Sequence, residues 1–311
     1  MRKKIVSSAP VRGFIEQTKH TTVPGGGNYT VFELFQAFIH QIRRTSLLER
    51  AAAISFNFFM AIPPVLIFVF TLIPYLPISK QFIHELFGII KDVVPGENNN
   101  AVIIGFLTDF LQKPRTGLLS FGLLLAIFFS SNAMMGVLRS FDKNYEGFRH
   151  TTSLQKRKTA LALTTIMLFT VFTCVILLVA QGAVLKELGI KKHGVRTIIS
   201  NSRWIVIILL AFLSVSVIYR HGPAKDKRWP LVTAGSVFAT TLMILATALV
   251  TFWVNNFNNY NKLYGSISAI FILMSLIWVN ALVLLLGFEL NVTISLLNQN
   301  PEDIKLTEAR R

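Results

Sequence analysis

Long apolar windows alternate with short polar segments along most of this chain. Six windows contain no Asp, Glu, Lys or Arg, and a helix that crosses a membrane needs about 20 apolar residues. Five windows reach that length, and the fourth is expected to extend back over residues 198–203. The windows are 51–79, 116–138, 159–185, 204–219, 229–261 and 263–288. The pattern predicts an all-α membrane protein with six transmembrane helices.

The basic residues between the windows predict the orientation of these helices. If the N-terminus is cytoplasmic, the inside segments carry roughly twice as many Lys and Arg as the outside segments. Cytoplasmic loops of membrane proteins are rich in these residues, so both termini are expected in the cytoplasm. The inside segments are then 1–50, 139–158, 220–228 and 289–311.

Amphipathic helices are expected at two places outside the windows. Apolar residues recur at helical spacing over 30–44, and Thr30 followed by Glu33 is a capping box that marks the start of this helix. Residues 80–112 predict two further amphipathic helices in the first external loop. These helices could cap the outer mouth of the bundle, or they could simply lie in the membrane interface.

Three regions follow from this reading. Residues 1–29 are expected to be a mobile basic tail, because they contain no long apolar stretch and end in a Pro-Gly-Gly-Gly linker. Residues 30–297 form the six-helix membrane domain. Residues 298–311 form a cytoplasmic tail.

Composition and charge agree with a lipid environment. Hydrophobic residues make up 52% of the 311-residue chain and charged residues only 15%, which is too apolar for a soluble globule. The net charge of +16 is spread over short segments between windows, a pattern that suits an anionic membrane surface better than nucleic acid. Membrane lipids are therefore the expected partners, with no nucleic acid and no soluble partner that the sequence identifies.

Polar residues inside the first window are candidates for a substrate path or for helix pairing, because polar groups in hydrocarbon are costly. Arg50, Asn57 and Pro64 are seven residues apart and lie on one helix face. Pro63 and Pro64 remove two backbone donors in mid-membrane, so they are expected to kink the helix or open a local gap.

Further candidates lie in the second and sixth windows. Asn132 belongs to a Ser-Ser-Asn patch, and Arg139 follows it by seven residues. In the sixth window Ser268 and Ser275 share a stripe with Glu289, while Asn280 lies on a second stripe. For the serines, hydrogen bonding between neighbouring helices is expected more than substrate contact.

Glu289 stands out among these residues, because it follows a long uncharged window and is embedded in Gly-Phe-Glu-Leu-Asn-Val. Its carboxylate could extend to the membrane surface, or it could pair with Arg50 or Arg139 at the same depth. We favour the pair, since three charged groups are predicted at one level of the bilayer.

No constellation for catalysis or cofactor binding is evident. The histidines are scattered, with no pair at metal-ligand spacing, and no nucleophile elbow, phosphate loop or Cys-x-x-Cys is present. No catalytic, metal or cofactor site is therefore predicted, and the chain is expected not to be an enzyme.

Several motifs resemble the YihY/BrkB family of six-helix bacterial inner-membrane proteins. The resemblance covers roughly residues 30–297 and is carried by five stretches. They are Arg-Ala-Ala-Ala-Ile-Ser-Phe at 50–56 leading to Pro63-Pro64, Ser-Ser-Asn at 130–132 through Tyr145, Tyr219 with Pro223, Leu-Tyr-Gly-Ser at 263–266, and Leu-Gly-Phe-Glu-Leu-Asn at 286–291. Asn57 departs from the pattern, where the family often has Tyr.

The resemblance implies a multi-pass protein of the bacterial cytoplasmic membrane. Members are described as virulence or serum-resistance factors and as candidate transporters, and an older ribonuclease BN name is regarded as a misassignment. The leading hypothesis is a transport or lipid-handling protein in which the first and sixth helices line a path. The alternative is a non-catalytic envelope scaffold or resistance factor, and RNA cleavage is disfavoured.

Overall fold

The computed structural model describes residues 29–75, 116–142, 145, 148, 151–187, 193–225, 228–256 and 267–298. Seven α-helices account for most of these residues, and the predicted all-α fold is confirmed for this part of the chain. They are α3 (Val31–Arg44), α4 (Leu47–Leu72), α7 (Thr116–Phe141), α8 (Ser153–Glu187), α9 (His193–His221), α10 (Ala234–Asn256) and α12 (Ile267–Leu297). A 3-10 helix, η1 (Ile73–Tyr75), follows α4, and one isolated β-bridge joins Phe148 to Lys225.

Some predicted regions lie outside the described residues. They are the N-terminal tail up to residue 28, the external cap at 80–112 and the C-terminal tail from residue 299. The predicted tails and the cap therefore stay predictions.

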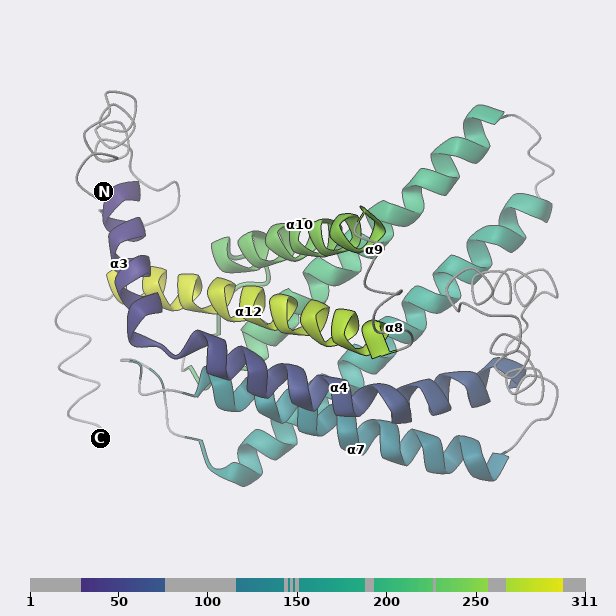
Figure 1. The fold of residues 1–311 in the computed structure, drawn as a ribbon, viewed down its shortest axis with the longest axis horizontal. Coiled ribbons are helices and arrows are strands. Elements are labelled where there is room, and N and C mark those ends of the chain that lie inside the picture. The colour runs from purple at the N-terminus through teal and green to yellow at the C-terminus, as the bar shows by residue number, and fades with distance from the viewer. Residues whose placement is uncertain are drawn as a thin grey trace.

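The amphipathic helix before the first span is confirmed as α3. The Glu33 amide donates to Thr30 Oγ1 at 3.3 Å, and the Thr30 amide donates to Glu33 Oε2 at 2.8 Å, which is a complete capping box. Arg43 and Arg44 lie in the last turn, where positive charge is favoured by the helix dipole. α3 packs against α12 at one end of the bundle (Figure 1).

The helices form an elongated bundle with a clear order of neighbours. α4 packs along α7, and α12 packs against both α4 and α10 (Figure 1). α8 packs on α7, and α9 packs on α8 and α10. The backbones of α8 and α9 diverge from the other helices toward the C-terminus of α8 and the N-terminus of α9.

Four helices are long and apolar enough to cross a membrane. They are Leu47–Leu72, Thr116–Phe141, Ala234–Trp253 and Ile270–Leu297. The apolar part of α9 that the structure describes with side chains, Ile205–His221, is shorter, although α9 itself begins at His193 and so extends the fourth window backward as expected.

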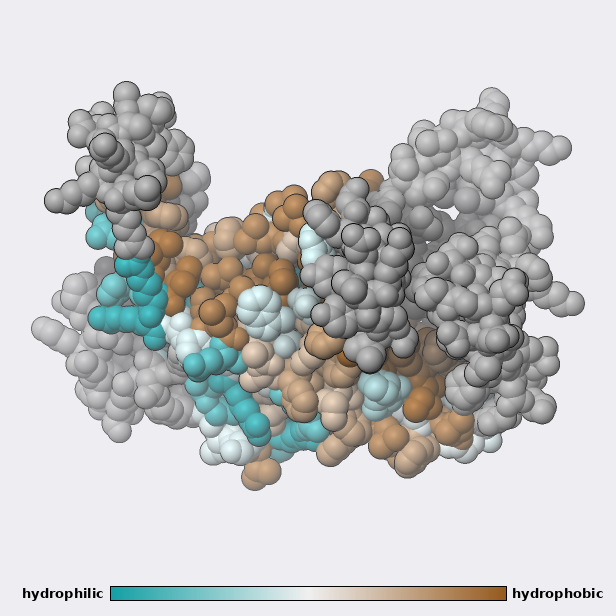
Figure 2. Space-filling view, in the orientation of Figure 1, coloured by the Kyte–Doolittle hydropathy of each residue, from teal (hydrophilic) through white to brown (hydrophobic). Residues whose placement is uncertain are grey.

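The outward faces of the helices are apolar. Large side chains such as Leu124, Phe169 and Leu249 are about two-thirds or more exposed, at 67%, 71% and 67%. Apolar surface is brown across the middle of the molecule in Figure 2, while hydrophilic residues gather toward the end where α3 lies. Such a surface suits contact with lipid chains rather than water.

The two prolines of α4 leave the helix continuous. α4 runs through Pro63 and Pro64 without a break, and the predicted kink stays a prediction. Neither proline has an amide to donate, so the carbonyls of Phe59 and Met60 lose their usual helical partners. Pro63 faces outward, whereas Pro64 is buried.

Candidate functional site

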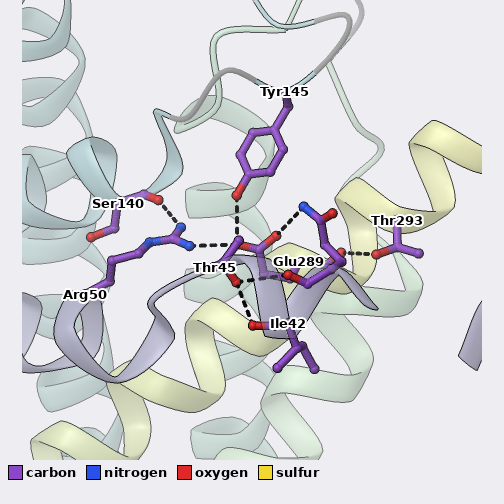
Figure 3. Close-up of polar contacts among 8 residues, drawn as sticks. Ile42, Thr45, Arg50, Ser140, Tyr145, Glu289 and Thr293 are labelled. Carbon is purple, nitrogen blue, oxygen red and sulfur yellow. Dashed lines mark hydrogen bonds and ion pairs between the residues drawn. The ribbon is translucent and has the colours of Figure 1, made fainter. Parts of the chain in front are cut away.

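A buried carboxylate, Glu289, is the centre of a polar cluster at the α3 end of the bundle (Figure 3). Its side chain is fully buried in α12. Arg50 Nη1 donates to Oε1 at 2.8 Å, the Tyr145 hydroxyl donates to the same oxygen at 2.7 Å, and Gln41 Nε2 donates to Oε2 at 3.2 Å. Three donors around one carboxylate compensate much of the cost of burying its charge. We call Gln41, Arg50, Tyr145 and Glu289 the Glu289 cluster.

Arg50 links three helices through this cluster. It lies in the first turn of α4 and is itself buried. Besides its ion pair with Glu289 on α12, its Nη2 donates to the Ser140 carbonyl near the end of α7. The last carbonyls of a helix have no partner within the helix and carry partial negative charge, so a guanidinium is well suited to that position. Arg50 therefore ties α4, α7 and α12 together at one level.

Arg139 takes no part in the cluster, so the alternative that it pairs with Glu289 is wrong. Its side chain is exposed, whereas its neighbours Leu138 and Ser140 are buried. Successive residues of a helix are rotated by about 100°. With Leu138 and Ser140 facing the bundle, Arg139 faces outward.

Tyr145 lies in the segment after α7 and holds its proton firmly. Burial raises the pKa of its hydroxyl well above the ordinary tyrosine value, and the neighbouring Glu289 carboxylate raises this pKa further. The hydroxyl therefore stays a donor to Glu289.

Aromatic side chains surround Phe288, the residue of α12 that precedes Glu289. Its ring stacks on Phe141 at 4.0 Å between centroids, with Tyr145 at 6.0 Å and Trp229 at 5.8 Å. The Tyr219 hydroxyl donates to the Leu284 carbonyl at 2.6 Å. These aromatic contacts pack beside the Glu289 cluster on α12.

Two glycines let α10 and α12 approach closely beside the aromatic side chains around Phe288. A Cβ at Gly287 would lie 2.5 Å from the Tyr219 hydroxyl oxygen and 2.7 Å from the Gly235 carbonyl oxygen. Asn291 Oδ1 accepts from the Gly235 amide at 2.9 Å, and Asn291 Nδ2 donates to Thr233 at 3.0 Å. Four of the five residues in the Gly-Phe-Glu-Leu-Asn segment, all but Leu290, thus make the packing and polar contacts described here.

The predicted asparagines join helices in pairs. Asn57 on α4 packs against Gly136 of α7, where a Cβ would lie 3.3 Å from its Nδ2. Asn132 on α7 accepts from Arg157 Nη1 on α8 at 2.6 Å. Asn280 on α12 donates to Thr247 on α10 at 3.4 Å.

The predicted serines of α12 differ from the asparagines. Ser275 is exposed, and it lies in a part of α12 where Phe271, Leu273 and Met274 are exposed as well, whereas Glu289 is buried. The side chain of Ser268 lies outside the described residues. The shared stripe predicted for these serines and Glu289 therefore does not form one buried face.

A largely apolar cavity of about 530 Å³ lies beside the prolines of α4, between α4, α7, α8 and α9. We call it the chamber. Leu66, which is exposed, and Thr164, which is buried, both line it, so the chamber extends from the outer surface into the bundle. Three hydroxyl side chains, Ser130, Thr164 and Ser214, are its polar groups. Neither Pro63 nor Pro64 lines the chamber, although their neighbours Ile62 and Val65 do.

A second cavity, of about 200 Å³, lies near the α3 end of the bundle and is lined by charged residues. We call it the basic pocket. Lys156, Lys225 and Arg228 line it together with one carboxylate, Asp142, which pairs with Lys156. Lys225 also contacts Ser295 and lies over the Trp229 ring at 5.4 Å.

Comparison with known proteins now identifies the family. Residues 38–311 match the model of the family described as virulence factor BrkB. The chain belongs to the BrkB family. It is therefore a membrane protein of this family, as its motifs suggested.

Two relatives of this BrkB-family chain are named as a ribonuclease-like protein and as a membrane protein. A ribonuclease-like protein, YfkH, of Bacillus subtilis is 29% identical over 259 residues, which cover 82% of this chain and 92% of that protein. The UPF0761 membrane protein Smlt0865 of Stenotrophomonas maltophilia is 21% identical over 279 residues, which cover 86% of this chain but only 62% of that protein. No solved structure is significantly similar.

Sequence reasoning missed several residues that shape these sites. Gln41 lies on the amphipathic α3, where a polar residue near the apolar face could have signalled a buried partner. Thr164 and Lys225 lie in no motif that marks them, because their surroundings are created by helices distant in sequence. Among the described residues, no group of three or more His, Cys, Asp or Glu is placed to hold a metal ion.

Proposed function

We propose that this BrkB-family protein handles lipids within the bacterial cytoplasmic membrane, by binding them and moving them or presenting them to another protein. The chamber carries this proposal. Its volume lies within the range of about 300–1,000 Å³ that is usual for ligand pockets, and its lining is largely apolar. An apolar cavity that opens toward lipid is suited to an acyl chain more than to a water-soluble solute.

The proposed path differs from the one suggested by the sequence. In the leading hypothesis from the sequence, the first and sixth helices, which are α4 and α12, line the path. The chamber is lined by α4 but by α7, α8 and α9 rather than α12. Glu289 is fully buried and held by three donors, which supports a structural role for the cluster.

The proposed membrane arrangement has six spans with both termini in the cytoplasm. Besides the four long apolar helices, α8 and α9 provide 35 and 29 residues, each long enough to cross the bilayer. Bacterial relatives named as membrane proteins support the location. Cysteine labelling at positions 20, 150, 225 and 305 should report cytoplasmic exposure, and labelling at position 98 should report external exposure. Position 98 labelled from the cytoplasm would overturn the arrangement.

An envelope scaffold is the second candidate, and the tight packing of the Glu289 cluster favours it, because a scaffold needs stable helix contacts and no path. RNA cleavage is not proposed. The ribonuclease-like name belongs to the Bacillus relative, and hydrolysis of RNA needs a metal or acid–base cluster for which this sequence has no motif.

Purified protein in liposomes separates these candidates. Fluorescent phospholipid in the inner leaflet should reach the outer leaflet faster than in protein-free liposomes, whereas entrapped small solutes should not leak. Movement of the solute but not of the lipid would replace lipid handling with solute transport. Movement of neither would contradict the proposal and favour the scaffold.

A further inference from the structure

We infer that the chamber and the basic pocket together form the binding site for one anionic phospholipid, with its phosphate in the basic pocket and an acyl chain in the chamber. This inference rests on the proposed lipid handling and names the class of lipid. It goes further, because it commits to a charge and to a position for each part of the ligand.

Three of the four helices that line the chamber, α7, α8 and α9, also line the basic pocket, about one turn away. On α7 the chamber reaches Met134 and the basic pocket reaches Leu138, four residues on. On α9 Ile218 lines the chamber and His221 lines the basic pocket. A turn of helix advances about 5.4 Å, a separation that the glycerol backbone of a phospholipid can bridge.

Residues of α8 continue this order. Lys156 and Thr159 line the basic pocket, and Thr164 lines the chamber. Charged residues therefore line the cavity at one end of these helices, and largely apolar residues line the next cavity along them. That is the order of groups in a phospholipid that lies along the bundle.

The charges of the basic pocket favour an anionic headgroup. Its lining contains three cations, Lys156, Lys225 and Arg228, and one carboxylate, Asp142. The excess positive charge would be repelled by the ammonium group of a zwitterionic lipid. Basic pockets between transmembrane helices are suited to anionic headgroups, and the end that holds this pocket is the one predicted to be cytoplasmic.

Several buried hydroxyls have no hydrogen-bond partner among the described residues, and Thr164 is the one of them that lines the chamber, whereas those of Tyr29, Ser131, Ser216 and Thr240 lie elsewhere. Its side chain is 2% exposed, and its Oγ1 has no hydrogen-bond partner among the described residues. The neighbouring Thr165 instead donates to the Leu161 carbonyl at 3.0 Å, as helical threonines in hydrocarbon usually do. The Thr164 hydroxyl is itself inaccessible in this structure, so a rotation of its side chain toward the chamber would let an ester oxygen at the head of an acyl chain accept from it and remove the cost of the unpaired hydroxyl.

Thermal unfolding of the full chain in detergent micelles, with added dioleoyl phosphatidylglycerol, tests the inference. This lipid should raise the unfolding temperature more than dioleoyl phosphatidylcholine, because a ligand that binds only the folded state stabilises it. Glycerol 3-phosphate and inorganic phosphate should have no comparable effect. Equal stabilisation by either phosphate compound would show a phosphate site and contradict the lipid assignment, as would equal stabilisation by phosphatidylcholine.

Matched variants test each half of the site. Arg228→Gln, at the mouth of the basic pocket, should raise the lipid concentration for half-maximal stabilisation roughly fivefold, whereas Arg43→Gln on α3 removes the same charge and should change it little. Ser130→Phe should fill part of the chamber and abolish the preference for phosphatidylglycerol, whereas Leu124→Phe on the outer face of α7 should keep it. Equal effects within either pair would overturn the inference. Lipid movement in liposomes without this selective binding would refute only the inference, and not the proposed lipid handling.

Discussion

The Glu289 cluster and the chamber lie in the same helix bundle and differ in how their central polar groups are paired, although Arg50 Nε of the cluster also lacks a hydrogen-bond partner among the described residues. In the cluster, a fully buried carboxylate has three donors, from α3, α4 and the segment after α7. In the chamber, the buried Thr164 hydroxyl has no partner among the described residues. Polar groups satisfied within the protein stabilise helix contacts, whereas an unsatisfied group beside a cavity leaves an interaction for a ligand. The comparison separates a region that holds the bundle together from a region that can bind a ligand.

The largest effect is expected when the buried ion pair is broken. Glu289→Gln leaves the buried Arg50 without a counter-charge and should lower the free energy of unfolding by about 3–5 kcal/mol. Unfolding in detergent micelles, followed by circular dichroism, measures this. The double variant Arg50→Met/Glu289→Leu should cost less than the summed single variants.

Asp142→Asn is the matched control for this prediction. It breaks the ion pair between Asp142 and Lys156. Their side chains are 27% and 20% exposed, and the change should lower the free energy of unfolding by about 0–1 kcal/mol. Similar losses for Glu289→Gln and Asp142→Asn would mean that burial gives the Glu289 pair no special weight.

The next largest effect concerns the close crossing of α10 and α12. Gly287→Ala would place a methyl group within 3 Å of Tyr219, Ala239 and the Gly235 carbonyl, and should cost about 3 kcal/mol because the helices must separate. Gly117→Ala, with no atom within 4 Å of the new methyl group, should be neutral or slightly stabilising. The same unfolding measurement checks both, and a neutral Gly287→Ala would contradict the described crossing.

Tyr145→Phe should lower the free energy of unfolding by less, about 2 kcal/mol, because it removes one hydrogen bond to a charged group. The cost should also depend on pH. Since the pKa of Tyr145 is raised by folding, its hydroxyl adds stability below the pKa of the unfolded chain, about 10, and that contribution falls as the pH rises above this value. Unfolding at rising alkaline pH should therefore bring the wild type and the variant closer together.

Tyr75→Phe is the control, because Tyr75 is 42% exposed. It should cost little at any pH. A gap between the wild type and Tyr145→Phe that stays constant across this alkaline range would show that Tyr145 titrates like an ordinary tyrosine.

The smallest effect is expected in the chamber. Thr164→Val removes a buried, unpaired hydroxyl at nearly constant shape and should stabilise the lipid-free protein by up to about 1 kcal/mol. Thr165→Val, one residue along α8 on an exposed position, should be close to neutral. A clear destabilisation by Thr164→Val would show that the hydroxyl has a structural partner.

The difference between the two regions also explains what the sequence could predict. Apolar windows placed the long helices, and the capping box located the start of α3, because both signals are local. A charge in an apolar window is rare, which singles out Glu289, and Arg50 is one of two cations predicted near it. The sequence could not decide between Arg50 and Arg139, because that choice depends on which face of α7 turns inward.

The chamber could not be predicted from the sequence. It lies between four helices, and its lining is mostly ordinary apolar residues such as Met134 and Ile218. Prolines in α4 suggested a disturbance of the helix, yet the helix is continuous and the cavity lies at its side. Cavities depend on how side chains of distant segments fill space, and hydrophobic periodicity does not encode this.

Transbilayer movement of fluorescent phosphatidylglycerol in liposomes tests most directly whether binding and stability belong to different regions. We compare Ser130→Phe in the chamber with Arg50→Met/Glu289→Leu in the cluster, at a temperature at which both variants are folded. The account predicts that Ser130→Phe abolishes the movement while the cluster variant retains it. Full movement by Ser130→Phe, together with its loss in a folded cluster variant, would contradict the account and place the path at Glu289.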